Sequence, residues 1–339
     1  IFVTNGGIAR IFTIAAATPG LGGARRGHSL ILLERGDAGL RAQGEERKLG
    51  LRGCSTTSLH LDGVEVPAER VIGEPGRGME LMGRVLAWGR TLMAAGCTGA
   101  ARSALAAAAV QVSTRRQFGR ALSAFEVVRA QIAQMAAVLF AMESLVAATC
   151  AAEDRPDELA VRSRAAKIFC SEGDWEICDL ALQLHGGAGF IEDSGLPILL
   201  RDARITRIFE GANDVLLVAH GMVEAGPRAA LGVGPGLQGA AAGAGRLAAA
   251  VASLRDDLHA RFGVRVVTQQ RLLHRLGRLL VLRDSADAAV LHAEKLATDE
   301  ARALAAHWVE LAWSRAAPLL QAPYDAGIVA AVAGRVLAQ

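Results

Sequence analysis

Residues 183–214 read QLHGGAGFIEDSGLPILLRDARITRIFEGAND. The stretch opens with a glycine-rich turn at Gly186–Gly189, where the absence of side chains permits positive φ and lets a ligand approach the backbone. It ends with Glu210 between Phe209 and Gly211, after a segment dense in arginine. A carboxylate in this setting is suited to act as a general base, because its surroundings can tune its ionisation. Taken alone, the spacing favours a helix cap or a solvated charge.

Apolar residues recur at three- and four-residue spacing on both sides of this stretch, which predicts amphipathic helices. The helices are expected at 79–109, 125–152, 158–185 and 199–223. Short polar breaks between them favour an antiparallel four-helix bundle. The longest apolar run, Ala130–Ala152, contains Gln131, Gln134 and Glu143. A membrane span tolerates such residues poorly, so a buried bundle helix is favoured.

Residues 1–74 have the character of strands, because short runs of β-branched and apolar residues are separated by glycine, proline and asparagine turns. Strands are expected at 2–4, 10–18, 28–34 and 57–66. The last of these alternates with a period of two, which is typical of a half-buried antiparallel strand. These residues are predicted to form part of an antiparallel β-barrel or sandwich.

The tail is predicted to be a separate helical domain. Residues 226–245 are rich in glycine and alanine and include two prolines, which is typical of a linker. Helical periodicity resumes afterwards at 247–264, 266–297, 298–320 and 328–337. The expected fold class is therefore α+β, with a partial β-domain at 1–74, a helical bundle at 75–225 and an additional helical domain at 226–339.

Composition excludes some classes of function. The chain has 339 residues and a net charge of +3, with basic and acidic residues interleaved. A nucleic-acid partner is not expected, because it would require a clustered basic face. The five cysteines form no CxxC pair and lack histidine at ligand spacing, so neither disulfides nor a metal site are expected, and they are interpreted as reduced core residues. The chain begins with Ile1 inside an expected strand, and a targeting segment that precedes it in the full protein is compatible with this start.

Five blocks of the chain, in the same order, resemble the acyl-CoA dehydrogenases. The blocks are Phe2–Gly6, Lys48–Arg52, Gly73–Gly78, Arg115–Gly119 and the opening stretch at 183–214. The resemblance covers residues 1 to 222, and the tail is more loosely similar to the extra helical domain of the very-long-chain members. Trp175 and the Asn213-Asp214 pair also resemble that subtype. The family adds an N-terminal helical domain before the residues that match this chain.

The resemblance implies that Glu210 removes the α-proton of an acyl-CoA while the β-hydride passes to FAD. Some relatives carry the base on an earlier helix, directly before an arginine that corresponds to Arg90, but the residue at that position here is Gly89. A glycine cannot act as a base, so Glu210 is the candidate. Arg90, Phe209 and Gly211 are expected beside the substrate, although Arg90 alone is equally typical of a surface ion pair.

The resemblance further implies a flavin site shared between two subunits. Phe2 and Thr4 match residues beside the flavin ring, although Phe2 alone is nearly as typical of a strand core. The other FAD positions, several of which reach the cofactor of the neighbouring subunit, are Arg115, Gln117, Phe118, Gln183, Gly186, Gly187 and Ala212. Ala212 stands where the family usually has threonine, so one hydroxyl contact to FAD is missing. The basic pair that begins at Arg115 is, by itself, equally typical of a solvated helix end.

The implied partners are a long-chain or very-long-chain acyl-CoA, an electron-transferring flavoprotein and a second copy of the chain. In the very-long-chain members the tail replaces a second dimer and helps to contact the membrane, so peripheral membrane contact is a further expectation. The expected location is the bacterial cytoplasm, or the mitochondrial matrix or the matrix face of the inner membrane if a targeting sequence precedes Ile1. The alternative function is a non-catalytic or dual-role helical assembly protein. Glu210 and the FAD motifs argue against the loss of catalysis.

Overall fold

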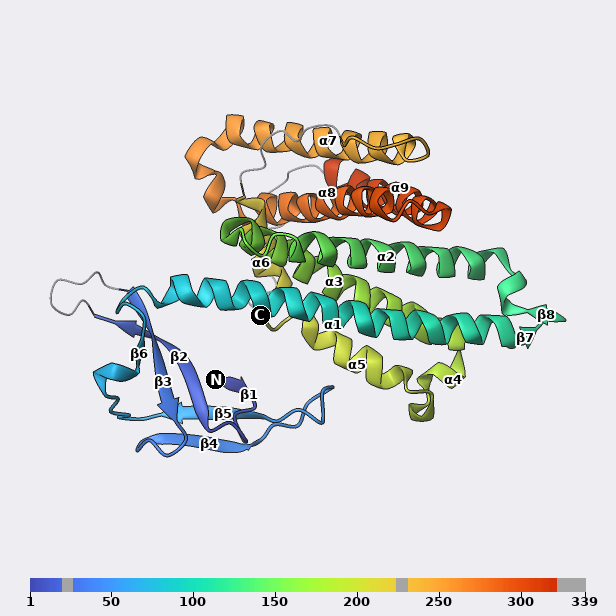
Figure 1. Cartoon of the computed structure of the whole chain (residues 1–339). Coiled ribbons are helices and arrows are strands. Elements are labelled where there is room, and N and C mark those ends of the chain that lie inside the picture. Colours follow the sequence, from blue (N-terminus) through green and yellow to red (C-terminus); the bar gives the residue numbers. More distant parts are fainter. Residues whose placement is uncertain (20–26, 224–230, 322–339) are drawn as a thin grey trace, which may run out of the picture. The chain divides into compact units, whose positions relative to one another are not determined.

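The structure is a computed structural model that describes residues 1–19, 27–223 and 231–321. Residue contacts divide the chain into two compact units, Ile1–Leu216 and Leu217–Gln339. Each unit is described below by itself. The first holds the described strands and several helices, and the second consists mainly of three long helices (Figure 1).

The described strands of the first unit form two three-stranded antiparallel sheets and one small two-stranded sheet. The three-stranded sheets have the orders β1-β5-β4 and β2-β3-β6, and their longest pairing sets Ile11–Thr18 against Gly27–Glu34. The bounds are β1 Phe2–Thr4, β2 Ile11–Thr18, β3 Gly27–Glu34, β4 Leu40–Glu45, β5 Thr56–Leu61, β6 Val71–Ile72, β7 Arg116–Gln117 and β8 Arg120–Ala121.

The prediction of antiparallel strands is correct, but neither three-stranded sheet closes into a barrel within the described residues. Each of them ends in an edge strand on both sides. Strand β4 was not predicted, because its sequence LRAQGE is largely exposed and lacks apolar alternation. Strand β6 was also missed, because it is only two residues long.

Helices account for most of the first unit. They are α1 Gly78–Thr114, α2 Glu126–Cys150, α3 Pro156–His185, α4 Gly187–Phe190, α5 Leu196–Thr206 and α6 Asn213–Gly221, which crosses into the second unit, with short 3-10 helices η1 Ala68–Arg70, η2 Leu122–Ala124 and η3 Glu192–Ser194. Helix α1 extends from the sheets to the β7–β8 hairpin, and α3 packs along it (Figure 1). Alanines on the inner face of α1 are fully buried, and their small side chains let α3 approach closely.

The predicted helix at 199–223 is wrong as a single element, because the chain leaves helical geometry between α5 and α6. Glu210 has a φ of 57° and Gly211 a φ of 102°, both in the left-handed region. A left-handed residue cannot continue a right-handed helix. This break is the element that presents Glu210.

By length and composition alone, α1 and α2 could each cross a membrane. In the structure α2 instead buries a continuous segment from Ala137 to Met142 against its neighbours. This agrees with the predicted buried bundle helix. Cys97, Cys170 and Cys178 are buried as expected, whereas Cys150 is exposed at the end of α2, where the helix leaves the core.

The strand-rich segment contacts the helices through its backbone N–H groups and through a short backbone bridge. The backbone N–H of Leu51 donates to Oδ1 of Asp202 on α5, at 2.5 Å. His28 forms an isolated bridge with Arg77, immediately before α1. The loop at 48–52 therefore docks on the helix that leads to Glu210.

Asp174 lies in the core of the bundle and is 2% exposed. The thiol of Cys178 donates to its Oδ1 at 3.5 Å, and burial raises the pKa of the Asp174 carboxyl to about 7. Between its usual value near 3.8 and about 7, the folded state binds more protons than the unfolded chain. The stability associated with this proton is therefore fully present below about pH 3.8 and is lost as the pH rises to about 7.

We therefore expect Asp174→Asn to raise the free energy of unfolding at about pH 8, by roughly 2–4 kcal/mol, and to change it little at about pH 4. Denaturant unfolding at the two pH values measures this difference. Asp179→Asn, on the exposed side of the same helix, is the matched control. An equal effect of Asp174→Asn at both pH values would contradict the buried-charge explanation.

The second unit packs three long helices, α7 Gln238–Phe262, α8 Gln270–Leu296 and α9 Asp299–Gln321, with the 3-10 helix η4 Gly263–Thr268 between the first two. The indole Nε1 of fully buried Trp308 donates to Ser285 Oγ at 3.2 Å. A methyl group on Gly277 would collide with the carbonyl of Leu217, so glycine permits the end of α6 to lie against α8.

The predicted linker at 226–245 is too long, because residues 238–245 form the first two turns of α7. Their alanines and glycines pack closely against α9, and Ala244 is fully buried. Small residues here therefore serve helix packing rather than flexibility. The predicted last turn at 328–337 lies outside the described residues.

Candidate active site

Glu210 lies in a tight turn that joins α5 to α6. The backbone N–H of Asn213 donates to the carbonyl of Arg207 at 3.0 Å and closes the turn. Within it, Glu210 adopts the left-handed conformation described above. Such conformations cost about 1–3 kcal/mol for a residue with a side chain and persist where surrounding contacts enforce them. The turn is therefore a strained element held by its neighbours, as functional sites often are.

The carboxylate of Glu210 is directed at α1. Its Oε2 is buried and has no hydrogen-bond partner among the described residues. A methyl group on Gly89 would lie only 3.0 Å from this oxygen, so the carboxylate rests against the bare backbone of α1. Burying a carboxylate oxygen without a hydrogen-bond donor costs free energy. A donor group of a ligand, or a proton, recovers this free energy when it reaches the oxygen.

Arg90, next along α1, holds the same turn through its backbone. Its Nε donates to the carbonyl of Glu210 at 2.9 Å. Burial lowers the pKa of the Arg90 guanidinium, and the nearby Glu210 charge opposes this effect. The structure thus brings Glu210, Gly211 and Arg90 together, with Phe209 and Ala212 half-buried in the same turn.

Helix α3 supports the turn from the other side through residues that the sequence analysis missed. Lys167 donates from Nζ to the carbonyl of Gly211 at 2.9 Å and to Oδ1 of Asn213 at 2.6 Å. The Asn213 amide in turn donates to Ser171 Oγ at 3.0 Å and to Glu172 Oε1 at 2.8 Å. The available signal was a lysine within the apolar face of a predicted bundle helix, a position where a charge needs partners.

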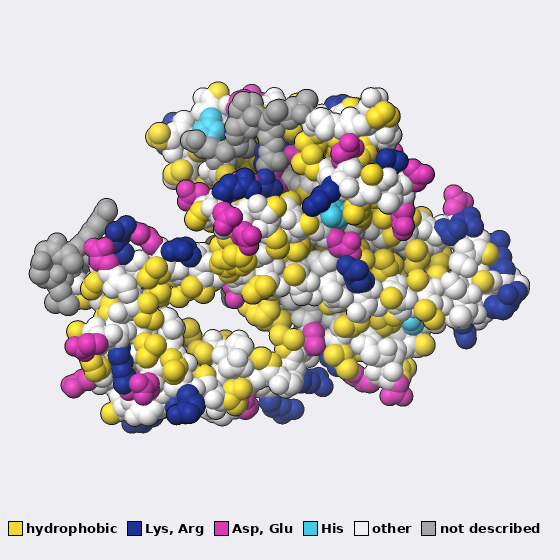
Figure 2. Space-filling view, viewed as in Figure 1, with side chains coloured by type: hydrophobic (Ala, Val, Ile, Leu, Met, Phe, Trp, Pro, Cys, Tyr) yellow, Lys and Arg dark blue, Asp and Glu magenta, His cyan; other side chains and the backbone are white. Residues whose placement is uncertain are grey.

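The remaining predicted FAD positions lie elsewhere in the first unit. Arg115, Gln117 and Phe118 are exposed at the β7–β8 end of α1, and Phe118 is 90% exposed, with its ring edge against Phe125. Arginine side chains gather over this end of the unit (Figure 2). Gln183 and the Gly186-Gly187 turn are exposed at the end of α3.

The two groups of predicted residues are far apart within one chain. Arg90 and Arg115 lie about 37 Å apart along α1, at about 1.5 Å per residue. Phe2, which is 75% exposed, and Thr4 belong to the edge strand β1 of a sheet at the other end of α1 from Arg115 (Figure 1). One chain therefore does not bring all the predicted flavin residues around one small molecule.

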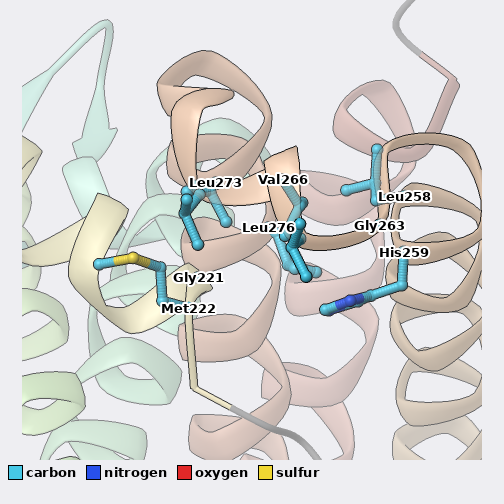
Figure 3. A pocket seen from close by; sticks show the side chains of 10 residues that line it. Gly221, Met222, Leu258, His259, Gly263, Val266, Leu273 and Leu276 are labelled. Atoms are coloured by element: carbon cyan, nitrogen blue, oxygen red, sulfur yellow. The ribbon is translucent and has the colours of Figure 1, made fainter.

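Two pockets lie outside the Glu210 turn. One, of about 470 Å³, lies between the loop at 50–54 and α5, and charged side chains including Arg201 line it. The other, of about 520 Å³, belongs to the second unit and is mostly apolar. Figure 3 shows Met222, Leu258, Val266 and Leu273 around it, with His259 directed inwards. Among the described residues, no group of histidine, cysteine and carboxylate side chains could hold a metal ion.

Comparison with known proteins agrees with this architecture. The family described as "Acyl-CoA dehydrogenase, C-terminal domain" matches residues 76–222. The very long-chain specific acyl-CoA dehydrogenase of mouse mitochondria is 37% identical over 221 residues, which cover 64% of this chain and 34% of the mouse protein. The chain therefore spans about a third of the length of this relative.

Solved structures extend the comparison to the fold. Butyryl-CoA dehydrogenase from Megasphaera elsdenii superposes with a TM-score of 0.61 and 33% identity, over 65% of this chain and 57% of that one. An acyl-CoA dehydrogenase complexed with FAD from Bacillus anthracis has a TM-score of 0.82 at 22% identity, over 94% of this chain and 61% of that one. The second match shares the fold of both units. Residues 76–222 therefore match the C-terminal domain of the acyl-CoA dehydrogenases, and the chain is similar to members of that family over 221 residues.

Proposed function

We propose that the protein containing this chain is an FAD-dependent acyl-CoA dehydrogenase that converts a long-chain or very-long-chain acyl-CoA to the trans-2-enoyl-CoA. The observation that carries the proposal is the buried, unpartnered Oε2 of Glu210 beside Gly89. This oxygen takes the α-proton of the substrate. The backbone N–H of the same residue stabilises the developing charge on the thioester oxygen. Bound FAD supplies the acceptor for the β-hydride.

The residues present suit FAD. Exposed Arg115 offers the forked donor that a diphosphate requires, and Gln183 adds an amide at the end of α3. Phe118 presents an exposed aromatic ring from a residue with a φ of 52°, a conformation rarely adopted by residues with large side chains. Because these groups lie far from Glu210 within one chain, we propose that they bind the FAD of a second copy. A homodimer is then the smallest functional assembly.

The partners follow from the same proposal. Reduced flavin must pass its electrons on, and the resemblance assigns this role to an electron-transferring flavoprotein. The proposed location is the bacterial cytoplasm or the mitochondrial matrix, where fatty acids undergo β-oxidation.

A chain-length series tests the function. The FAD-loaded full-length protein is titrated with acyl-CoA thioesters from butyryl to stearoyl in the absence of oxygen. We expect stoichiometric bleaching of the flavin absorbance, strongest with the longer chains, and an enoyl-CoA product. Bound flavin that no acyl-CoA bleaches would refute the dehydrogenase and favour the alternative, a non-catalytic assembly protein.

We also propose that the second unit contacts a membrane peripherally, through the end that carries η4. Val264 is 89% exposed there, Val267 and Met222 are exposed beside the apolar pocket, and exposed Arg261 and Arg265 flank them. Exposed apolar side chains among arginines are suited to an anionic lipid surface.

The double variant Val264→Asp/Val267→Asp is therefore expected to lower binding to anionic vesicles by at least about tenfold, because it removes apolar area and adds negative charge. Co-sedimentation with phosphatidylglycerol vesicles measures the binding. Val127→Asp, an exposed valine on α2, is the control. Equal sedimentation of all three proteins would refute the membrane contact.

A further inference from the structure

We propose that Lys167 is the positioning residue of this active site and that it holds the Glu210 turn in the geometry needed for proton abstraction. This inference rests on the proposed function for its catalytic part. Its structural part, that the lysine holds the turn, rests on the contacts alone.

The contacts of Lys167 converge on the turn. The ammonium is fully buried, and both of its hydrogen bonds end within three residues after Glu210, at the carbonyl of Gly211 and the side chain of Asn213. From the opposite helix, Arg90 binds the carbonyl of Glu210. Two consecutive carbonyls are thus held by cations from α1 and α3. This arrangement fixes the peptide unit between them, and with it the direction of the Glu210 side chain.

A network of hydrogen bonds along one face of α3 also ties the Glu210 turn to this helix. Lys167, Ser171 and Glu172 are spaced so that their side chains share a helix face. Ser171 and Glu172 accept hydrogen bonds from the Asn213 amide, which leaves the Asn213 oxygen facing the ammonium. Glu172 also forms an ion pair with Arg207, the first residue of the turn, at 2.9 Å. Both ends of the turn are therefore tied to α3.

The choice of lysine is informative in this chain. Only three of its 37 basic residues, Lys48, Lys167 and Lys295, are lysines. The one that is fully buried carries a compact ammonium, which suits two acceptors at close range better than a planar guanidinium. Burial lowers the pKa of Lys167 to about 8, with Cys97, Arg90, Glu172 and Glu210 as its charged or titratable neighbours. Burying an ammonium group costs free energy unless hydrogen-bond acceptors compensate for the lost water. The acceptors of Lys167 belong to the strained turn.

When Lys167 is replaced, we expect the carboxylate of Glu210 to be positioned less precisely. Displacement of a catalytic group by about 1 Å costs on the order of 100-fold in rate. Without the ammonium, the carbonyl of Gly211 and the Asn213 oxygen lose their donor, and the left-handed residue between the two cations can relax. Substrate binding should change little, because Lys167 lies beneath the turn and faces away from solvent.

The test separates proton abstraction from the rest of the reaction. An acyl-CoA with sulfur in place of the β-carbon can lose its α-proton but cannot transfer a hydride. Exchange of its α-hydrogens for solvent deuterium, catalysed by the FAD-loaded full-length protein, therefore reports on the base alone. We expect Lys167→Met to slow this exchange by about 100-fold with little change in the affinity for the analogue. Lys295→Met, at an exposed lysine, should exchange as the wild type does.

Backbone amide exchange of residues 207–213 gives a second readout that needs neither substrate nor turnover. It should be faster in Lys167→Met than in the wild type, while amides elsewhere in α1 and α3 stay protected. If Lys167→Met does not fold, Asn213→Ala, which removes one acceptor of the ammonium, should show the same two effects at about a tenth of their size.

The outcomes distinguish a failure of the positioning role of Lys167 from a failure of the proposed function. Wild-type exchange rates in Lys167→Met, of both the α-hydrogens and the turn amides, would overturn the positioning role. A wild-type protein that exchanges no α-hydrogens would refute the proposed function instead. In that case the amide exchange alone decides whether Lys167 holds the turn.

Discussion

Glu210→Gln is expected to lower the rate of acyl-CoA dehydrogenation by about 10³- to 10⁴-fold while FAD stays bound. The amide keeps the size and shape of the side chain, so the turn, the hydrogen bond from Arg90 to the Glu210 carbonyl and the packing against Gly89 should persist. What is lost is the basic oxygen. Oε2 is buried without a donor, and no other carboxylate occupies the neighbouring position on α1, because that position is Gly89.

The measurement is single-turnover bleaching of the flavin in the full-length holoprotein, with flavin content determined from the absorbance before substrate is added. Glu153→Gln, an exposed glutamate after α2, is the matched control and should bleach at the wild-type rate. A Glu210→Gln protein that bleaches as fast as the control would remove this residue from the reaction and require another base.

The second large effect is expected from mixing two inactive variants. Glu210→Gln removes the base, and Arg115→Ala removes a donor that we assign to the FAD of the partner chain. In a mixed dimer, one site combines both defects, whereas the other takes Glu210 from one chain and Arg115 from the other and is intact. Random reassociation of equal amounts should therefore restore about a quarter of the wild-type activity.

This recovery depends on the geometry of α1. If Arg115 acted on the flavin of its own chain, every site in the mixture would lack either the base or the arginine, and activity would stay near that of the separate variants. Co-expression of the two variants with different affinity tags, followed by isolation of the doubly tagged dimer, measures the outcome directly. The doubly tagged dimer should have about half of the wild-type activity per dimer.

The helices show which parts of the fold could be predicted from the sequence alone. Apolar periodicity placed α1, α2 and α3 to within a few residues, because a repeat of three and four is maintained through long buried faces. The same periodicity continued through residues 207–212 and therefore predicted one helix where the structure has two. The positive φ of Glu210 breaks the helix although its side chain carries no signal for a turn.

The residues that support the Glu210 turn also could not be predicted from local sequence patterns. Glu210 and Arg90 were identified because their types and positions resemble a known family. Lys167 has no such resemblance to mark it, and its position within the apolar face of a predicted helix indicates a need for partners without naming them. Its role emerges only when α3 is placed beside the turn, so that an ammonium meets a carbonyl 44 positions further along the chain.

The sequence by itself indicated the fold class of this protein: strands followed by several long helices, with a glycine-rich turn between two of them. These features depend on local propensity and periodicity, which act between near neighbours in the chain. Only the tertiary structure decided that Glu210 rests against Gly89, that Arg90 and Lys167 hold consecutive carbonyls from two helices, and that Arg115 lies too far away to share their site. Those relations depend on which helix faces pack together, and packing is a property of the whole fold.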